Sequence, residues 1–502
     1  MWYKTPMARP ASGHRTARVL IYTHRWLGVG LGVLFVVWFV SGVIMMYARM
    51  PALDDAERLA RLPAINPASI REAPPGGEIA RLTISTLEGR PVYRITTNGR
   101  TEFVFADAGG RVPAVDAGQA MRIARAFDGG HRELRYDARL ADADQWSFGI
   151  RGRMPAHRIA VEDAAGTELY VTEAGGEVVL KTNASGRFWG WTGAVLHWLY
   201  FTPFRRNGAL WNGMIVWVSI AGTVMCLAGV AWGAWRLAPL RGYRLKRERH
   251  WSPYAGWMRW HHYAGLIFGV VTTTWIFSGL LSMDPWDWHP GTAPTREQRQ
   301  RVSGGAIDAR ELTVERLRAV VGAYADAPPK EVEIVRYRGR HFALSAAGLV
   351  PFDDPHSGPV PRLADDSVVE SAKLAMADVP IDDMAWLNDY DAYYYDRDRR
   401  LSLPVLRVQY ADPQRTWLYF DPARAGVVRK EERLTRVNRW LYHGLHSLDF
   451  PFLYYKRPLW DIVVIGLSIG GLILSATTLT ASWRRVRKAI ASGWRSGTGS
   501  SG

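Results

Sequence analysis

Cysteine is nearly absent from this sequence. Its 502 residues contain a single one, Cys226, which lies in a long apolar stretch. One cysteine excludes an intramolecular disulfide, a thiolate-held iron–sulfur cluster and a haem attached through a C-x-x-C-H motif. Any haem in this protein must therefore be held without covalent thioether bonds.

Acidic residues are nearly absent from three segments, 1–25, 236–260 and 484–502. Together these segments contain 17 Lys and Arg residues and one acid, Glu248, so they account for the whole formal net charge of +16. Each segment borders a long apolar stretch, and basic residues concentrated beside membrane spans mark the cytoplasmic side. The pattern predicts that both termini and the middle segment are cytoplasmic, and it argues against nucleic-acid binding.

Long apolar stretches occur four times, at 26–47, 210–235, 261–283 and 459–483. A helix needs about 20 mainly apolar residues to cross a hydrocarbon layer of ~30 Å. The first stretch also resembles a signal peptide, but its apolar core is too long and no small-residue cleavage site precedes Ala48. We therefore predict a membrane bundle of four transmembrane helices.

The stretches between spans one and two, and between spans three and four, have the patterning of exported α+β modules. Glu78–Ile84 and Pro91–Ile95 alternate as strands do, whereas Arg122–Phe127 and Val314–Tyr324 have helical character. We expect a histidine-bearing interfacial helix to follow each module. The predicted segments are 1–25 (N-terminus), 26–47 (first span), 48–187 (first module), 188–209 (interfacial helix), 210–235 (second span), 236–260 (basic loop), 261–283 (third span), 284–436 (second module), 437–458 (interfacial helix), 459–483 (fourth span) and 484–502 (basic tail).

The second half of the sequence repeats the first. His24 precedes the pair Ser41-Gly42 by 17 residues, and His261 precedes Ser278-Gly279 by the same interval. Later segments match at a constant offset of 249 residues. We predict two parallel repeats, each with a span, an exported module and a second span. The pairs at this offset include Met154-Pro155 with Leu403-Pro404, Arg158 with Arg407, Tyr170 with Tyr419, His197 with His446, Trp211 with Trp460, Ser219 with Ser468 and Gly222 with Gly471.

Histidines gather at the ends of the predicted spans. Neutral imidazole is the usual axial ligand of low-spin haem, and two facing helices can supply one ring each. Six of the 13 histidines occupy such places. They are His24, His261 and His262 at the cytoplasmic ends of the first and third spans, and His197, His443 and His446 at the outer entry to the second and fourth.

The repeat suggests how these histidines pair. It matches His24 with His261 and His197 with His446, which gives two pairs of axial ligands. From His24 to Ser41 a helix rises about 26 Å at ~1.5 Å per residue. We therefore expect two haems, one near each face of the membrane.

A simpler explanation exists for each histidine alone, because a single histidine at a helix end is often only an interfacial polar residue. The symmetric recurrence favours ligation, since ionisable groups near membrane depth are costly and tend to be functional. His443 aligns with Ala194 and has no mate, so it could be a substitute ligand, a supporting hydrogen-bond donor or neither. His262 points about 100° away from His261 on a helix, so we expect only one of the two to bind the same iron.

Two further patterns have both a functional and a simple structural explanation. Gly28, Gly30 and Gly32 form a stripe that would allow close approach of a helix or a haem. An acidic, aromatic run would be either a solvated loop or a docking surface for an external substrate. It contains Asp382, Asp383, Asp389, Asp391 and Tyr393–Tyr395.

Several of these elements also occur together in one known family. They span the chain from about residue 18 to 485. They are His24-Arg25-Trp26-Leu27-Gly28 with Ser41-Gly42, the echo of this motif from His261, the strand Pro91-Val92-Tyr93-Arg94, the run Phe105-Ala106-Asp107-Ala108-Gly109-Gly110, and Leu445-His446.

With these elements the sequence resembles the PepSY-associated transmembrane helix proteins. That resemblance implies a bacterial inner-membrane protein with two periplasmic PepSY-like modules and b-type haem in a four-helix bundle, as in ferric-siderophore reductases. Some relatives continue into a flavin-containing reductase domain. This sequence has no G-x-G-x-x-G followed by a nucleotide-binding pattern, so we expect a separate electron donor, either a quinol or a cytoplasmic reductase.

Three functions remain to be compared. We expect an electron conduit that reduces a ferric chelate, such as a ferric siderophore, on the outer side, because hard oxygen ligands hold Fe(II) far less tightly than Fe(III). The alternative is a non-enzymatic accessory or regulatory protein that acts through its exported modules. A transporter fits least well, because the spans lack broken helices and mid-membrane charges.

Overall fold

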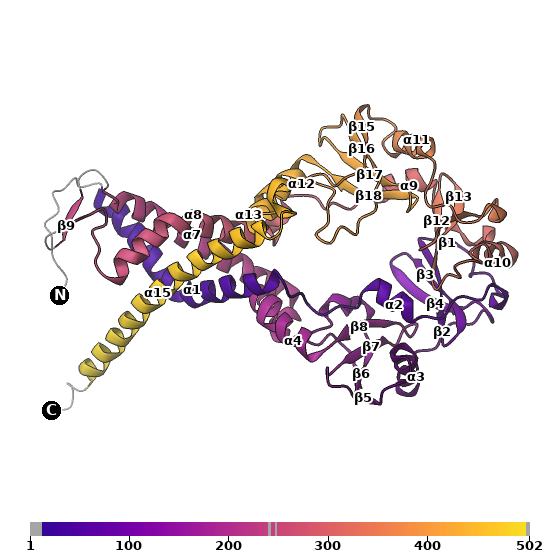
Figure 1. Cartoon of the computed structure of the whole chain (residues 1–502), viewed down its shortest axis with the longest axis horizontal. Helices are drawn as coiled ribbons and strands as arrows, with labels where there is room; N and C mark the ends of the chain where they lie inside the picture. Colours follow the sequence, from indigo (N-terminus) through magenta and orange to yellow (C-terminus); the bar gives the residue numbers. More distant parts are fainter. Residues whose placement is uncertain (1–12, 239–241, 246–247, 498–502) are drawn as a thin grey trace. The chain divides into compact units, whose positions relative to one another are not determined.

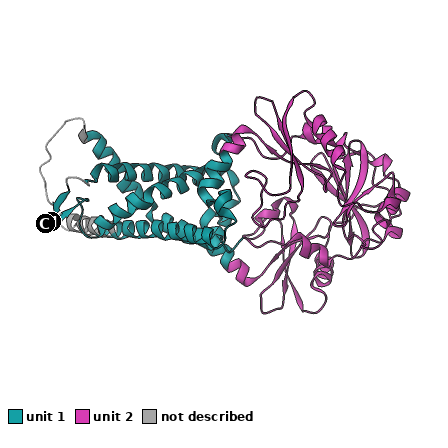
Figure 2. Cartoon of the chain, turned by 45° about the horizontal axis from the view of Figure 1, so that its top comes forward, with its two compact units in different colours: residues 1–49, 189–288, 438–502 teal, residues 50–188, 289–437 magenta. Residues whose placement is uncertain are grey.

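The computed structural model describes residues 13–238, 242–245 and 248–497. The chain divides into two compact units, coloured separately in Figure 2. The helical unit combines the stretch up to Arg49 with Trp189–Trp288 and the chain from Asn438 onward. The strand-rich unit combines Met50–Phe188 with His289–Val437, so each unit is assembled from both halves of the sequence.

The helical unit is built on four long helices. Within the described part of the chain, these four are long and apolar enough to cross a membrane, which confirms the predicted spans. The first begins before residue 26, because the helix continues through the basic residues ahead of the apolar stretch, and the last extends beyond residue 483. They are α1 (Gly13–Met45), α7 (Gly208–Arg236), α8 (Trp257–Leu281) and α15 (Leu459–Gly497).

The four helices, labelled in Figure 1, form a ring in which α1 packs against α7 and α15, and α8 packs against the same two helices. Helices α1 and α8 are therefore diagonally opposite. Glycine allows large rings to lie against neighbouring backbones, since a Cβ on Gly471 would come within 2.2 Å of the Phe39 ring. Phe35, Phe39, Met225 and Cys226 form the buried centre of the ring.

The segments that lead into α7 and α15 are broken helices. We expected one interfacial helix in each of 188–209 and 437–458, but a π-helical turn interrupts each helix, and a left-handed residue, Leu199 or Leu448, ends it. A new helix then begins at a proline-containing turn, because proline is accommodated in a first turn but not in a helix interior. The pieces are α4 (Ala184–Gly190), π-turn Trp191–Val195, α5 (Leu196–Trp198) and α6 (Thr202–Arg205), then α12 (Arg433–Asn438), π-turn Arg439–Gly444, α13 (Leu445–Ser447) and α14 (Pro451–Tyr454).

Both segments that we predicted to be exported contribute to one central sheet of the strand-rich unit. Its strand order is β14-β13-β12-β2-β3-β4, and the two halves join where Ile84 of β2 lies opposite Val332 of β12. The segments predicted as separate modules are thus parts of one compact unit. The strands are β2 (Arg81–Leu87), β3 (Arg90–Thr97), β4 (Arg100–Phe105), β12 (Val332–Tyr337), β13 (Arg340–Ser345) and β14 (Gly348–Pro351).

Each segment adds a four-stranded antiparallel sheet that is covered by a helix. In the first, α3 (Ala117–Asp128) packs on β5–β8, and in the second, α11 (Asp365–Ala375) packs on β16 and β17. The helix α10 (Val314–Gly322) packs on the central sheet, so the α+β prediction is confirmed. The strands are β5 (Leu134–Leu140), β6 (Ala156–Val161), β7 (Glu168–Thr172), β8 (Val178–Thr182), β15 (Ile381–Leu387), β16 (Val405–Tyr410), β17 (Trp417–Asp421) and β18 (Gly426–Glu431).

The remaining elements are short. A two-stranded pair joins the two segments again, because β1 lies antiparallel to β11. These elements are α2 (Asp55–Arg61), α9 (Arg296–Ser303), β1 (Glu78–Ile79), β11 (Ile307–Asp308), and the hairpin β9 (Tyr243–Leu245) with β10 (Glu248–His250) in the loop between α7 and α8.

The same partly buried triad of Asp, Arg and Tyr recurs in both four-stranded sheets. One oxygen of Asp144 accepts hydrogen bonds from Arg158 (2.9 Å) and from the Tyr170 hydroxyl (2.9 Å). In the second sheet, an oxygen of Asp391 accepts from Arg407 (3.3 Å) and the Tyr419 hydroxyl (3.1 Å). Burial, and then the adjacent carboxylate, raises the pKa of both tyrosines.

This triad also accounts for part of the acidic, aromatic run. Asp391 accepts the two hydrogen bonds of the triad, while Asp382 pairs with Arg415 and Asp383 pairs with Arg407. These three carboxylates thus bond to the protein's own arginines, which argues against the docking surface, although Asp382 and Asp383 lie in strand β15 and not in the predicted loop.

The close packing of Gly471 yields a first prediction. The substitution Gly471→Ala should destabilise the detergent-solubilised protein by about 1–3 kcal/mol, because the new methyl group overlaps the Phe39 ring. The matched control is Gly466→Ala on the same helix, where a Cβ would meet nothing within 4 Å. Equal melting temperatures for the two variants would contradict this packing.

A second prediction concerns the pH dependence of the strand-rich unit. His341 of β13 is 5% exposed, with its Nδ1 3.2 Å from Glu311, and burial lowers its pKa more than Glu311 raises it. The unfolded chain takes up a proton near pH ~6.5 while the folded chain does not, so stability falls as the pH drops below that value. His341→Gln should reduce the loss of melting temperature between pH ~7.5 and ~5.5. The exposed His356 provides the control: His356→Gln should keep the wild-type loss, and an unchanged loss in His341→Gln would contradict the assignment.

Candidate functional site

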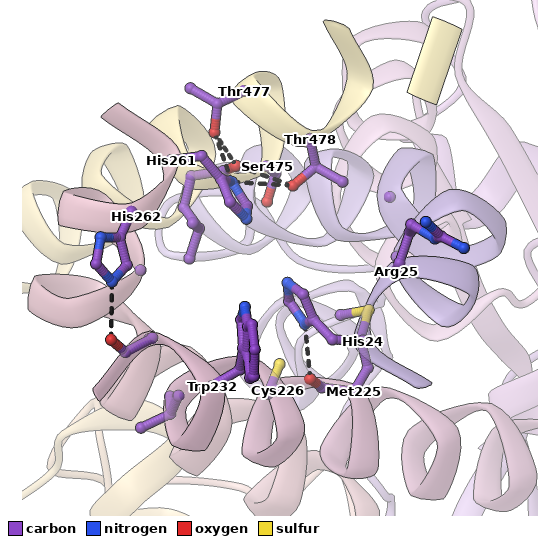
Figure 3. Close-up of a pocket in the computed structure, with 18 of the residues that line it drawn as sticks. His24, Arg25, Met225, Cys226, Trp232, His261, His262, Ser475, Thr477 and Thr478 are labelled. Atoms are coloured by element: carbon purple, nitrogen blue, oxygen red, sulfur yellow. Dashed lines mark hydrogen bonds between the residues drawn. The ribbon is translucent and has the colours of Figure 1, made fainter. Parts of the chain in front are cut away.

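A cavity of about 260 Å³ lies inside the helical unit between α1, α7, α8 and α15. Figure 3 shows His24 of α1 and His261 of α8 directed toward each other across it. Among the described residues that line the cavity, Arg25 has the one charged side chain, and the walls are otherwise mostly apolar. Glycines from three helices open the space: Gly28, Gly32, Gly229, Gly233, Gly265 and Gly269.

His24 and His261 form the inner pair. Their ring centres are 5.9 Å apart, and each Nδ1 is held by a neighbouring helix. The Nδ1 of His24 lies 2.9 Å from the carbonyl oxygen of Met225 on α7, and that of His261 lies 2.9 Å from the Thr477 hydroxyl on α15. A Cβ on Gly229 would come within 2.5 Å of the His24 ring, so glycine there permits the ring's position.

His197 and His446 form the outer pair. They lie in α5 and α13, directly after the two π-helical turns, and their ring centres are 6.2 Å apart. Each Nδ1 is 3.1 Å from a serine hydroxyl, Ser41 on α1 for His197 and Ser278 on α8 for His446. The pairing predicted from the repeat is therefore the pairing that the structure brings together.

The surroundings of the outer pair favour the neutral form of both rings. Burial, and then the neighbouring His446, lowers the pKa of His197 to about 3, and burial also lowers the pKa of His446. A neutral imidazole is the form that binds a metal through a ring nitrogen.

The hydrogen bonds fix which nitrogen of each ring bears the proton. The Met225 carbonyl can only accept, so His24 must donate from Nδ1. The hydroxyls of Ser41 and Thr477 already donate to carbonyls of their own helices at 2.6 Å, so they accept from His197 and His261. His446 also lies 3.2 Å from the Trp275 carbonyl, which again requires a proton on Nδ1. In all four rings Nδ1 therefore carries the proton, and Nε2 is the nitrogen with the chemistry to bind a metal.

His262 has the opposite arrangement. It is 6% exposed, its Nε2 lies 2.8 Å from the Gly233 carbonyl, and its Nδ1 lies 2.8 Å from the Ser252 hydroxyl. Both ring nitrogens are thus used to hold the loop after α7 against the helices, and Figure 3 shows the side chain apart from the inner pair. Of the two adjacent candidates, the structure favours His261 as a ligand.

His443 lies in the second π-helical turn with its side chain exposed, and its ring centre is 4.4 Å from that of Tyr442. In the outer site the ring that lies close to His197 is that of His446, with the ring centres 6.2 Å apart. The structure therefore gives His446, not His443, the place equivalent to His197.

The distance between the two rings of each pair would suit an iron whose other ligands come from a cofactor. Two metal–imidazole bonds of ~2.0 Å on opposite sides of one metal place the ring centres roughly 6 Å apart, close to the 5.9 and 6.2 Å observed. A bare ion needs three or four protein ligands, and no group of three His, Cys, Asp or Glu side chains suited to one occurs in the part of the chain that the structure describes. In haem, the porphyrin supplies the other four nitrogens.

The comparison with known families agrees with this architecture. The sequence matches the family described as PepSY-associated TM region over residues 21–366. The chain belongs to this family. The matched part contains His24, His197 and His261 and ends before His446, while a search of curated proteins gave no match. With four apolar helices, this PepSY-associated protein is a multi-pass membrane protein.

Sequence reasoning identified the four paired histidines but not all of their partners. Ser41 and Ser278 appeared only as markers of the repeat, although their constant distance of 17 residues from His24 and His261 was a usable signal. Thr477 and the Met225 carbonyl had no such signal, because residues that meet from different helices need not be a fixed number of residues apart in the sequence.

Proposed function

We propose that the protein binds two b-type haems and transfers electrons across a bacterial inner membrane to a ferric chelate. The observation that carries this proposal is the geometry of the two histidine pairs. In each pair the ring centres are about as far apart as those of two imidazoles bound to one iron. The Nδ1 of each ring donates a hydrogen bond to another group of the protein.

His24 and His261 would hold one haem, and His197 and His446 the other. When bound, the haem iron supplies reversible one-electron chemistry. The protein's own contribution is to orient the four imidazoles and surround them with apolar helix faces. The span from His24 to Ser41, whose hydroxyl accepts from His197, corresponds to about 26 Å of helix rise, so the two pairs serve opposite ends of the bundle.

The charge pattern supports an orientation. Basic segments flank the inner ends of the spans, which would place both termini and the loop after α7 in the cytoplasm and the strand-rich unit in the periplasm. A separate donor, a quinol or a cytoplasmic reductase, would be oxidised near the inner pair. At the outer side one electron would reduce Fe(III) in the chelate, for example a ferric siderophore, and the hard oxygen ligands would then release Fe(II).

The proposal includes two parallel repeats with PepSY-like exported parts. Paired histidines, π-helical turns, left-handed leucines and Asp–Arg–Tyr triads recur in both halves. A matching indole bond also recurs, from Trp211 to the Trp198 carbonyl (3.0 Å) and from Trp460 to the Ser447 carbonyl (2.9 Å). These recurrences support duplication of an ancestral half.

We predict that detergent-purified protein contains two haems b per chain. His24→Ala and His261→Ala should each reduce one spectroscopic component, and His197→Ala and His446→Ala the other, because each removes one of two axial ligands. Haem content and reduced-minus-oxidised spectra measure this. The exposed His443→Ala is the control and should keep both haems.

Two outcomes would count against this assignment. A colourless protein from haem-replete cells would favour the non-enzymatic alternative, in which the strand-rich unit binds a partner. Loss of the same component in all four variants would contradict two separate sites.

We further predict the side on which the acceptor reacts. In vesicles with one protein orientation and the haems reduced beforehand, a membrane-impermeant ferric siderophore should reoxidise the protein only from the side of the strand-rich unit. A chromogenic Fe(II) chelator on that side should collect the product. Reoxidation from the side of the basic segments alone would reverse the direction, and none with any ferric chelate would indicate a different acceptor.

A further inference from the structure

The two serines that hold the outer histidines are equivalent in sequence and have equivalent places in the structure. The His197 Nδ1 lies 3.1 Å from the Ser41 hydroxyl, and the ring also has a hydrogen bond with the Trp38 backbone. The His446 Nδ1 lies 3.1 Å from the Ser278 hydroxyl and 3.2 Å from the Trp275 carbonyl. The counterpart of Trp275 is Trp38, whose indole N–H also donates to the His197 carbonyl at 2.9 Å.

Both serines are built into the bundle. Ser41 is 1% exposed and Ser278 is fully buried, and each also donates to a carbonyl of its own helix. A Cβ on the following glycine, Gly42 or Gly279, would lie 3.3 or 3.5 Å from the adjacent histidine ring. The Ser-Gly pair therefore combines an acceptor for the imidazole with space for its ring.

A hydrogen bond from the Nδ1–H of a ligating histidine affects the metal in two ways. It fixes the orientation of the ring, and it increases the basicity of Nε2. A more basic axial ligand stabilises Fe(III) relative to Fe(II) and so lowers the reduction potential, one of the ways in which a protein tunes haem.

We propose that Ser41 and Ser278 are positioning residues that set the reduction potential of the outer site. This inference rests on the proposed function, since it concerns the same histidines. Each serine hydroxyl accepts from the Nδ1 of one outer histidine. The backbone of Trp38 or Trp275 is a second partner of the same ring, so loss of the hydroxyl weakens the hydrogen bonding of the imidazole without abolishing it.

The inner pair provides an independent comparison. The His261 Nδ1 lies 2.9 Å from the Thr477 hydroxyl, which has the role of Ser41 at the opposite end of the bundle. Thr477→Val removes this acceptor while keeping the shape of the side chain. It should therefore change the inner site and leave the outer site unaffected.

The test is a spectroscopic redox titration of the full-length protein in detergent, with the two components identified by the histidine variants. Ser41→Ala should raise the potential of the outer component by an amount equivalent to about a tenfold change in Fe(III) stabilisation, 59 mV for one electron. Ser278→Ala should raise it similarly, Thr477→Val should raise the inner component alone, and Ser41→Thr should keep the wild-type value because the hydroxyl is kept.

The control is Ser468→Ala, because Ser468 is 7% exposed in α15 and bonds to the Val464 carbonyl of its own helix (2.7 Å). It should leave both potentials unchanged. Electron paramagnetic resonance of the oxidised protein provides a second readout, because a reoriented axial imidazole changes the low-spin signal while haem content stays the same.

Failure of this inference can be distinguished from failure of the proposed function. Protein without haem would remove the function and the inference together. Two bound haems whose potentials and low-spin signals are the same in Ser41→Ala and Ser468→Ala would overturn the inference alone.

Discussion

Hydrogen-bond donors inside the bundle must find acceptors in the protein, because the hydrocarbon surroundings offer none. Each paired histidine has one such donor, Nδ1–H, and a neighbouring element satisfies it with a carbonyl or a hydroxyl. Because Nδ1 carries the proton of this hydrogen bond, Nε2 is the nitrogen with the chemistry to bind a metal. The requirement that stabilises the fold thus also prepares the site.

The two halves meet this requirement at equivalent places with different groups. At the inner end His24 bonds to a backbone carbonyl, whereas His261 bonds to the Thr477 hydroxyl. At the outer end both partners are serines, and a tryptophan backbone group is a second partner of each ring.

The sequence predicted the features that depend on period, length and charge. The four spans follow from apolar length, the strands and helices around Glu78–Ile84 and Arg122–Phe127 follow from local periodicity, and the histidine pairing follows from the repeat. The features that it did not predict arise from contacts distant along the chain. No local pattern reveals that β2 pairs with β12 or that the His262 ring is held between Gly233 and Ser252. The π-helical turns were also missed, because an extra residue in a helical turn alters geometry without altering composition.

The shared central sheet has a consequence for biogenesis. Strand β2 is complete early in synthesis, but its partner β12 lies beyond both α7 and α8. Until that later strand is made, β2 presents an open edge with the apolar side chains of Leu82 and Ile84 beside it, the kind of surface that recruits other chains. Closing such a distant pairing is entropically slow and leaves partly folded chains exposed to aggregation. The first half of the chain therefore cannot complete the strand-rich unit alone. Completion of the central sheet requires β12, which is made only after α7 and α8.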